Sequence, residues 1–164
     1  MNNPTEFSPG GVFPFLMLPF GLERFTFEKP SLIELHMASA HFPIALLLTS
    51  VACDVIGAVW KKAEGFRTTA FWTHILGTSS AAATVALGWF GNPTRGNNNE
   101  FAQMVTVHQW WGIAALVIFA LLAVWRVKRG PKCSRVETTA YALVSLLGVA
   151  LVSVTGYLGS LLGG

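Results

Sequence analysis

The stretch Met104–Trp125 reads MVTVHQWWGIAALVIFALLAVW and contains no Asp, Glu, Lys or Arg. A helix of about 20 apolar residues crosses the roughly 30 Å of hydrocarbon in a bilayer, so this stretch predicts a transmembrane helix. Three further stretches meet the same criterion. The four predicted spans are Met37–Val59, Ala70–Gly91, Met104–Trp125 and Ala140–Leu162.

The composition of the whole chain agrees with a membrane protein. Of its 164 residues, 52% are apolar and only 12% are charged, against about 25% charged residues in soluble domains. The formal net charge of +3 is too small and too scattered to indicate a nucleic-acid partner. Neither Cys53 nor Cys133 belongs to a C-x-x-C-H motif, which excludes covalent c-type haem attachment.

Short links between the spans predict how the helices are arranged. Successive spans joined by short links become antiparallel neighbours, so we expect an all-α integral membrane protein with an antiparallel bundle of four transmembrane helices. The middle link, Asn92–Asn99, is rich in Asn, Gly and Pro and cannot continue a helix. The bundle is assigned to residues 33–164, and residues 1–32 form an N-terminal arm whose stretch 12–22 is apolar but too short to span.

The distribution of Lys and Arg predicts the orientation, because cytoplasmic loops carry the excess of positive charge. The first and third links are basic, whereas the opposite side is poor in charge. Basic residues on the first side are Lys61, Lys62, Arg67, Arg126, Lys128, Arg129, Lys132 and Arg135, and those on the other are Arg24, Lys29 and Arg95. We therefore expect both termini in the periplasm and the protein in a bacterial inner membrane, in contact with lipid.

Ionisable residues at membrane depth are costly and so mark functional sites. His41 and His108 each lie four residues inside the outer end of a predicted span, about 6 Å deep. Two imidazoles at matched depth on different helices are what axial ligation of one haem b requires. The sequence predicts His41 and His108 as the iron ligands, with Gly88 and Gly112 near the same depth giving a macrocycle room.

Two other histidines remain alternative ligands. His36 precedes His41 by five residues, roughly 140° around a helix, so the two cannot both face one pocket in a regular helix. At the headgroup boundary, His36 is expected to be solvated. His74 belongs to the other leaflet, where no second histidine lies at its depth, so a second bis-histidine haem is not expected.

Asp54 and His74 are predicted at similar depth near the cytoplasmic side. Facing each other, a carboxylate and an imidazole offset part of their burial cost. Such a pair is able to pass protons or hydrogen-bond a quinone, because imidazole titrates in the physiological range. The alternative is a structural contact between helices.

The stretch His36–Leu46, HMASAHFPIAL, resembles a bacterial family of predicted four-helix membrane proteins with the signature H-P-x-x-x-H-F-P-I-x-L. The resemblance extends over about residues 34–160 and includes Asp54, His74 and the H-x-x-x-G from His108 to Gly112. Met37 departs from the proline of the signature. The resemblance implies a haem-binding redox subunit that works beside cytochrome c or Rieske-type domains.

The leading hypothesis is thus a cytochrome b-like subunit with one haem b near the periplasmic face. It would relay electrons between the quinone pool and a c-type cytochrome or a larger redox complex, with the redox chemistry supplied by the cofactor. No catalytic residue is assigned, and whether the chain is an enzyme by itself stays open. The alternatives are a cofactor-free membrane anchor of a multisubunit complex and a protein that binds chlorophyll-type pigment.

Overall fold

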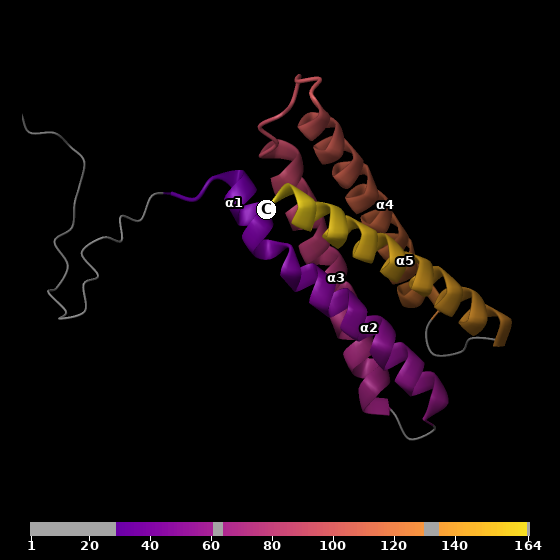
Figure 1. Cartoon of the computed structure of the whole chain (residues 1–164). Coiled ribbons are helices and arrows are strands. Elements are labelled where there is room, and N and C mark those ends of the chain that lie inside the picture. The colour runs from indigo at the N-terminus through magenta and orange to yellow at the C-terminus, as the bar shows by residue number, and fades with distance from the viewer. Residues whose placement is uncertain (1–28, 61–63, 130–134, 164) are drawn as a thin grey trace, which may run out of the picture.

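The computed structural model describes residues 29–60, 64–129 and 135–163, and all the regular secondary structure in these ranges is helical (Figure 1). The apolar stretch 12–22 of the predicted arm lies outside the described residues. The prediction of an all-α chain is confirmed for the described part. Its helices are α1 (Leu32–Ser39), α2 (His41–Val59), α3 (Glu64–Phe90), α4 (Glu100–Arg129) and α5 (Arg135–Leu162).

The first predicted span begins earlier than expected and is interrupted. Ser31 caps α1: its hydroxyl accepts a hydrogen bond from the Glu34 amide, and the Glu34 carboxylate accepts one from the Ser31 amide. This reciprocal capping box starts the helix at Leu32 rather than at Met37. The helix is interrupted between Ser39 and His41, although Ala40 keeps helical dihedral angles and its amide donates to the His36 carbonyl. The missing bond is the one to the Ser39 carbonyl, because Pro43 has no amide hydrogen.

The other helices also extend beyond the predicted spans. The predicted third link, 126–139, is wrong at both ends, because α4 continues through Arg126 to Arg129 and α5 already begins at Arg135. Arg and Lys are good helix formers, so a helix does not stop where its apolar stretch ends. Likewise α3 begins at Glu64, six residues before the predicted Ala70.

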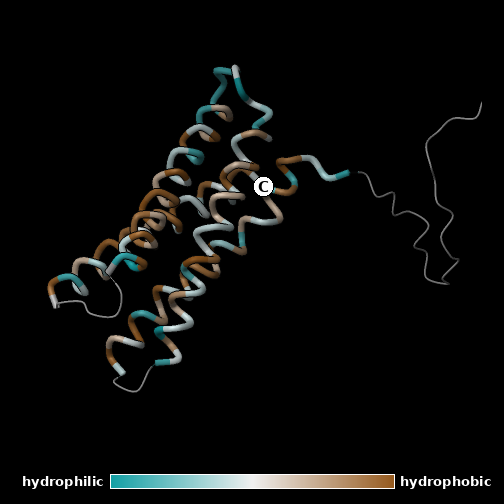
Figure 2. Tube along the Cα trace, turned by 180° about the vertical axis from the view of Figure 1, so that it is seen from behind, coloured by the Kyte–Doolittle hydropathy of each residue, from teal (hydrophilic) through white to brown (hydrophobic). Residues whose placement is uncertain are grey.

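Three stretches of the described residues are long and apolar enough to cross a membrane: Leu32–Val59, Glu100–Lys128 and Val136–Leu162. Helix α3, which carries the second predicted span, is not among them, and its stretch from Thr73 to Ser80 contains His74 and several hydroxyl side chains. Figure 2 shows apolar residues along the helices, and hydrophilic residues at the turn between α3 and α4.

The helices associate as two pairs. Helix α2 packs along α3 and α4 packs along α5, while α3–α4 and α2–α5 contacts join the two pairs; α1 lies against α3 (Figure 1). Helices α1 and α2 are the two segments of one interrupted span, Leu32–Val59. We therefore count them as one and refer to α1–α3 as the first helix pair and to α4–α5 as the second. Phe119 and Leu122 of α4 are almost fully buried where the pairs meet, together with Leu47 of α2.

The link between α3 and α4 interrupts the helices, as the sequence predicts, and its own polar side chains form hydrogen bonds within the turn. The Asn92 carboxamide oxygen accepts hydrogen bonds from the Thr94 amide and hydroxyl, both at 2.8 Å. Gly96 adopts a positive φ of 91°, which glycine alone adopts without steric cost. The Asn99 side chain accepts from the Ala102 amide and so caps α4.

Candidate functional site

A cavity of about 440 Å³ lies between the two helix pairs, at the end where α1 packs. All five helices and the Asn-rich turn contribute to its walls, which are mainly apolar. Five of the residues predicted as cofactor-binding or as alternative ligands line it: His36, His41, Gly88, His108 and Gly112. The structure thus gathers the histidines of one end of the molecule around a single space.

His36 is held against the neighbouring helix of its own pair. Its Nδ1 lies 2.8 Å from the carbonyl oxygen of Thr84 in α3. A carbonyl only accepts, so Nδ1 carries the hydrogen and Nε2 keeps its lone pair. The ring is partly buried, which overturns the expectation of a solvated His36.

His108 repeats this arrangement in the second helix pair. Its Nδ1 lies 3.1 Å from the carbonyl oxygen of Thr155 in α5, so that in the neutral imidazole Nδ1 carries the hydrogen and Nε2 has the free lone pair. The centres of the His36 and His108 rings are 6.1 Å apart, and their planes cross at 87°. The structure therefore places His36, rather than the predicted His41, opposite His108.

His41 stands at the first position of α2 with an exposed side chain, although it borders the cavity. The reason is the helical rotation of roughly 140° over five residues. Once His36 turns toward α3 and α4, the His41 ring is directed elsewhere. Both histidines nevertheless border the same cavity, so the expectation that only one of them would face the pocket is not confirmed; what distinguishes them is that His36 faces His108.

Glycines give the two facing histidines their space. A Cβ on Gly88 would lie 2.8 Å from Nδ1 and Cε1 of His36, and a Cβ on Gly159 would lie 3.2 Å from Cε1 of His108. Gly112 has no such tight neighbour, since its Cβ would meet Thr155 at an ordinary 3.5 Å. Gly88 thus accommodates an imidazole, a role that the sequence pattern does not assign to it.

We expect Gly88→Ala to displace His36 and to destabilise the protein by about 1–3 kcal/mol, the usual cost of overpacking. Gly156→Ala is the matched control: it lines the same cavity, but its Cβ would lie 3.8 Å from Ile44. Both changes raise helix propensity equally. Unfolding of the two variants by SDS titration in mixed micelles measures the difference, and equal stabilities would contradict the steric role of Gly88.

The two helix pairs carry the same pattern of residues. His36 contacts Thr84 and Gly88 as His108 contacts Thr155 and Gly159. A second set of equivalent contacts lies further along the helices. A Cβ on Gly77 would lie 3.0 Å from Leu47, and a Cβ on Gly148 would lie 2.9 Å from Phe119. Each residue of the second pair follows its counterpart by 71 or 72 positions. The cavity therefore lies between two similar halves of one chain, and this repeat is a sequence signal that identifies His36 and His108 together.

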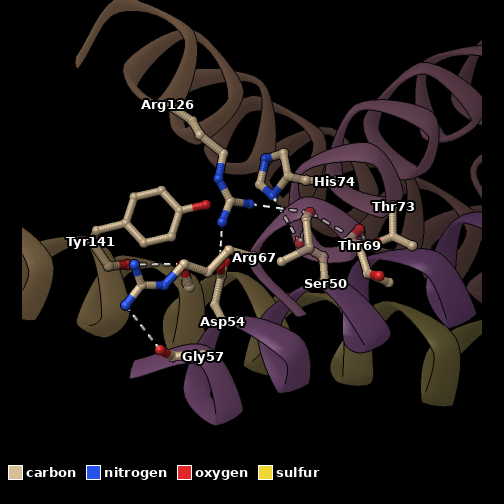
Figure 3. A network of polar contacts seen from close by, with 11 residues as sticks. Ser50, Asp54, Gly57, Arg67, Thr69, Thr73, His74, Arg126 and Tyr141 are labelled. Carbon is tan, nitrogen blue, oxygen red and sulfur yellow. Dashed lines mark hydrogen bonds and ion pairs between the residues drawn. The ribbon is translucent and has the colours of Figure 1, made fainter. Parts of the chain in front are cut away.

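A polar cluster ties the helix pairs together at the opposite end (Figure 3). The Arg126 guanidinium of α4 forms an ion pair with Asp54 of α2 and donates a hydrogen bond of 3.1 Å to the Ala70 carbonyl of α3. It also lies over the ring of Tyr141 in α5, 5.4 Å from the ring centre. One side chain thus contacts the three other long helices.

His74 belongs to the same cluster and is only 1% exposed. Its Nε2 donates to the Phe119 carbonyl of α4 at 3.0 Å, and its Nδ1 lies 3.4 Å from the Ser50 hydroxyl of α2. Asp54 and His74 are brought into one cluster, as the sequence predicts, but their hydrogen bonds go to other partners. The second carboxylate oxygen of Asp54 is buried without a hydrogen-bond partner among the described residues.

The described residues contain no group of three or more His, Cys, Asp or Glu side chains able to hold a metal ion. Two imidazoles alone are fewer than the three or four protein ligands of typical zinc sites. His36 and His108 do not by themselves make up such a group. His74, whose two ring nitrogens both have partners, is less suited to be a ligand than either.

The fold and the site define a helical membrane protein with a histidine-lined cavity between two similar helix pairs. The chain belongs to the DUF2231 family, described as a predicted membrane protein, which matches residues 33–163. This match and the three candidate spans among the described residues support location in a membrane. No curated protein and no solved structure significantly matches the chain.

Proposed function

We propose that the protein is a cytochrome b-like membrane subunit that binds one haem b between its helix pairs, with His36 and His108 as axial ligands. The observation that carries this proposal is the spacing of the two rings, 6.1 Å between centres. When bound, haem supplies reversible one-electron transfer. The residues of the chain hold it, orient it and exclude water.

The spacing agrees with coordination of one iron from opposite faces. A metal–nitrogen bond to imidazole is about 2.0–2.1 Å, and the nitrogen lies about 1.1 Å from its ring centre. Two end-on imidazoles on one metal therefore have centres a little more than about 6 Å apart. The angle of 87° between the ring planes is compatible, because coordination to one metal does not itself prescribe the angle between two imidazole planes.

The hydrogen bonds of both histidines prepare them as ligands. Ligating imidazoles commonly donate their second ring N–H to a carbonyl or carboxylate, which fixes the tautomer and the ring orientation. The Thr84 and Thr155 carbonyls provide this contact for His36 and His108. The sequence hypothesis of a bis-histidine haem is therefore kept, with His36 in the place of His41.

The cavity fits a large flat apolar ligand better than a bare ion. Its 440 Å³ falls within the roughly 300–1,000 Å³ of small-molecule and cofactor sites. On α4 its lining extends from Phe101 to Leu116, with His108 near the middle, so there is space both above and below the two rings. A macrocycle supplies the four nitrogen ligands that the chain does not provide.

The membrane setting of this site is also part of the proposal. We infer an antiparallel four-helix bundle in a bacterial inner membrane, with α3 as the fourth crossing helix, both termini in the periplasm and the haem near that face. The asymmetry of Lys and Arg between the links supports this orientation. Electrons would pass between the quinone pool and a c-type cytochrome or a larger redox complex.

A reduced-minus-oxidised absorption spectrum of the purified full-length protein tests the proposal. Expressed with sufficient haem, the protein is expected to give the sharp α-band of a six-coordinate, low-spin b-type haem, with about one haem per chain by pyridine haemochrome assay. Metal analysis and pigment extraction of the same sample identify any other occupant.

A colourless protein that co-purifies with redox partners would overturn the proposal and favour the cofactor-free anchor. Extraction of a chlorophyll-type pigment would equally overturn it. Two imidazoles at this spacing also suit a two-coordinate metal ion, so stoichiometric copper without haem would exclude a cytochrome while keeping the His36–His108 pair as the metal site.

A further inference from the structure

The cavity walls are nearly matched between the two helix pairs, but not at every position. Ile44 and Ala81 of the first pair correspond to Leu116 and Val152 of the second, and all four are apolar. One of the differences lies next to the histidines: Gln109 of the second pair corresponds to Met37 of the first. This difference makes one wall of the cavity polar.

The Gln109 carboxamide is fixed by its neighbours at the loop end of the cavity. Its Nε2 donates to the Gly88 carbonyl at 3.3 Å, and its Oε1 accepts from Asn92 Nδ2 at 3.4 Å. Asn92 is fixed in turn by Thr94, whose amide and hydroxyl donate to Asn92 Oδ1. A carboxamide nitrogen carries two hydrogens, so each amide keeps one N–H beyond these bonds.

We propose that Asn92 and Gln109 form the carboxylate-binding rim of the cavity, where they receive the acidic side groups of the bound tetrapyrrole. This inference rests on the proposed haem function. A carboxylate placed at the opposite end would lie among Ile44, Leu116 and Val152, where burial of an unpaired charge is very costly. At the loop end, neutral N–H donors are available to it.

A positive charge stands near the same rim. The Arg95 guanidinium lies over the ring of Trp89, 5.4 Å from its centre, and donates a hydrogen bond to the Trp89 carbonyl. Trp89 itself lines the cavity. Arg95 therefore contacts a residue that lines the cavity without lining the cavity itself. Its exposed positive charge favours anionic groups at this end, although salt screens the effect.

Titration of the full-length protein, purified without haem from haem-limited cells, tests the rim. The two probes are protohaem IX, with two free carboxylates, and its dimethyl ester, which has the same macrocycle and iron but no charge. We expect the unmodified protein to bind protohaem roughly tenfold more tightly than the ester, the effect of a hydrogen bond to a charged group.

Gln109→Met gives α4 the residue that the first helix pair has at this position. It is expected to lose most of the preference for protohaem while binding the ester as before. Gln109→Glu, with a like charge at the rim, is expected to weaken protohaem binding further, again without affecting the ester. Met37→Leu is the matched control on the other wall and should keep the original preference.

The outcomes separate this inference from the function on which it rests. A bis-imidazole spectrum with an unchanged protohaem-to-ester ratio in both Gln109 variants would overturn the rim and leave the haem site standing. Equal loss of both probes in Gln109→Met would assign Gln109 a packing role and also overturn the rim. If neither probe gives a bis-imidazole spectrum with the unmodified protein, both proposals fail.

Discussion

Replacement of His36 by alanine is expected to abolish the low-spin b-type spectrum, whereas replacement of His41 leaves it intact. The reason is geometric: the His36 ring faces His108 with its centre 6.1 Å away, and the His41 side chain is exposed at the start of α2. Loss of one axial ligand leaves a five-coordinate, high-spin iron or no bound haem. His108→Ala is expected to have the same effect as His36→Ala.

Chemical rescue makes this prediction specific. His36→Ala leaves a space of imidazole size beside Gly88 and the Thr84 carbonyl, so added imidazole is expected to restore the low-spin band in this variant. Absorption spectra with and without imidazole measure the effect. A normal band in His36→Ala together with its loss in His41→Ala would contradict the assignment. It would favour His41 and His108, the pair predicted from depth along a straight helix.

The sequence predicts the helical class and the approximate spans because an apolar run of about 20 residues with few charges is typical of a membrane-spanning helix. Depth counted from Met37, however, selects His41, whereas the ring that lies opposite His108 is that of His36. Ser31 and Glu34 form the S-x-x-E pattern of a capping box, which signals a helix start at Leu32. Counted from the observed helix starts, His36 lies four residues inside α1 and His108 eight residues inside α4, so equal distance from a helix start does not identify the facing pair.

The hydrogen-bond partners of the buried polar groups are harder to predict from sequence. Arg126 follows the apolar run of α4 and resembles a loop residue by composition, yet the helix continues and its guanidinium turns back to Asp54. A long side chain near a helix end often reaches several ångströms from its own backbone. Which helix it reaches depends on packing, and the role of Asp54 and His74 in proton or quinone chemistry stays a prediction.

Asp54→Ala is expected to destabilise the protein by about 3 kcal/mol, the lower end of the cost of leaving one buried charge without its partner. Both side chains of the pair are about four-fifths buried, with relative exposures of 18% for Arg126 and 21% for Asp54. The unpaired guanidinium would keep its contacts with the Ala70 carbonyl and the Tyr141 ring. SDS-titration unfolding measures the loss.

The double variant Asp54→Leu/Arg126→Met distinguishes a structural tie from a site of proton or quinone chemistry. Replacing both charges by apolar groups of similar size is often neutral for stability, so this variant is expected to regain most of the stability that Asp54→Ala loses. His74, bound to the Phe119 carbonyl, would still join α3 to α4. If the pair is only structural, the double variant also keeps normal reduction of its haem by a quinol. The opposite outcome is a double variant that folds normally and has a normal haem spectrum but is no longer reduced by a quinol. That result would assign the cluster a part in the reaction, because only proton or quinone handling would be lost.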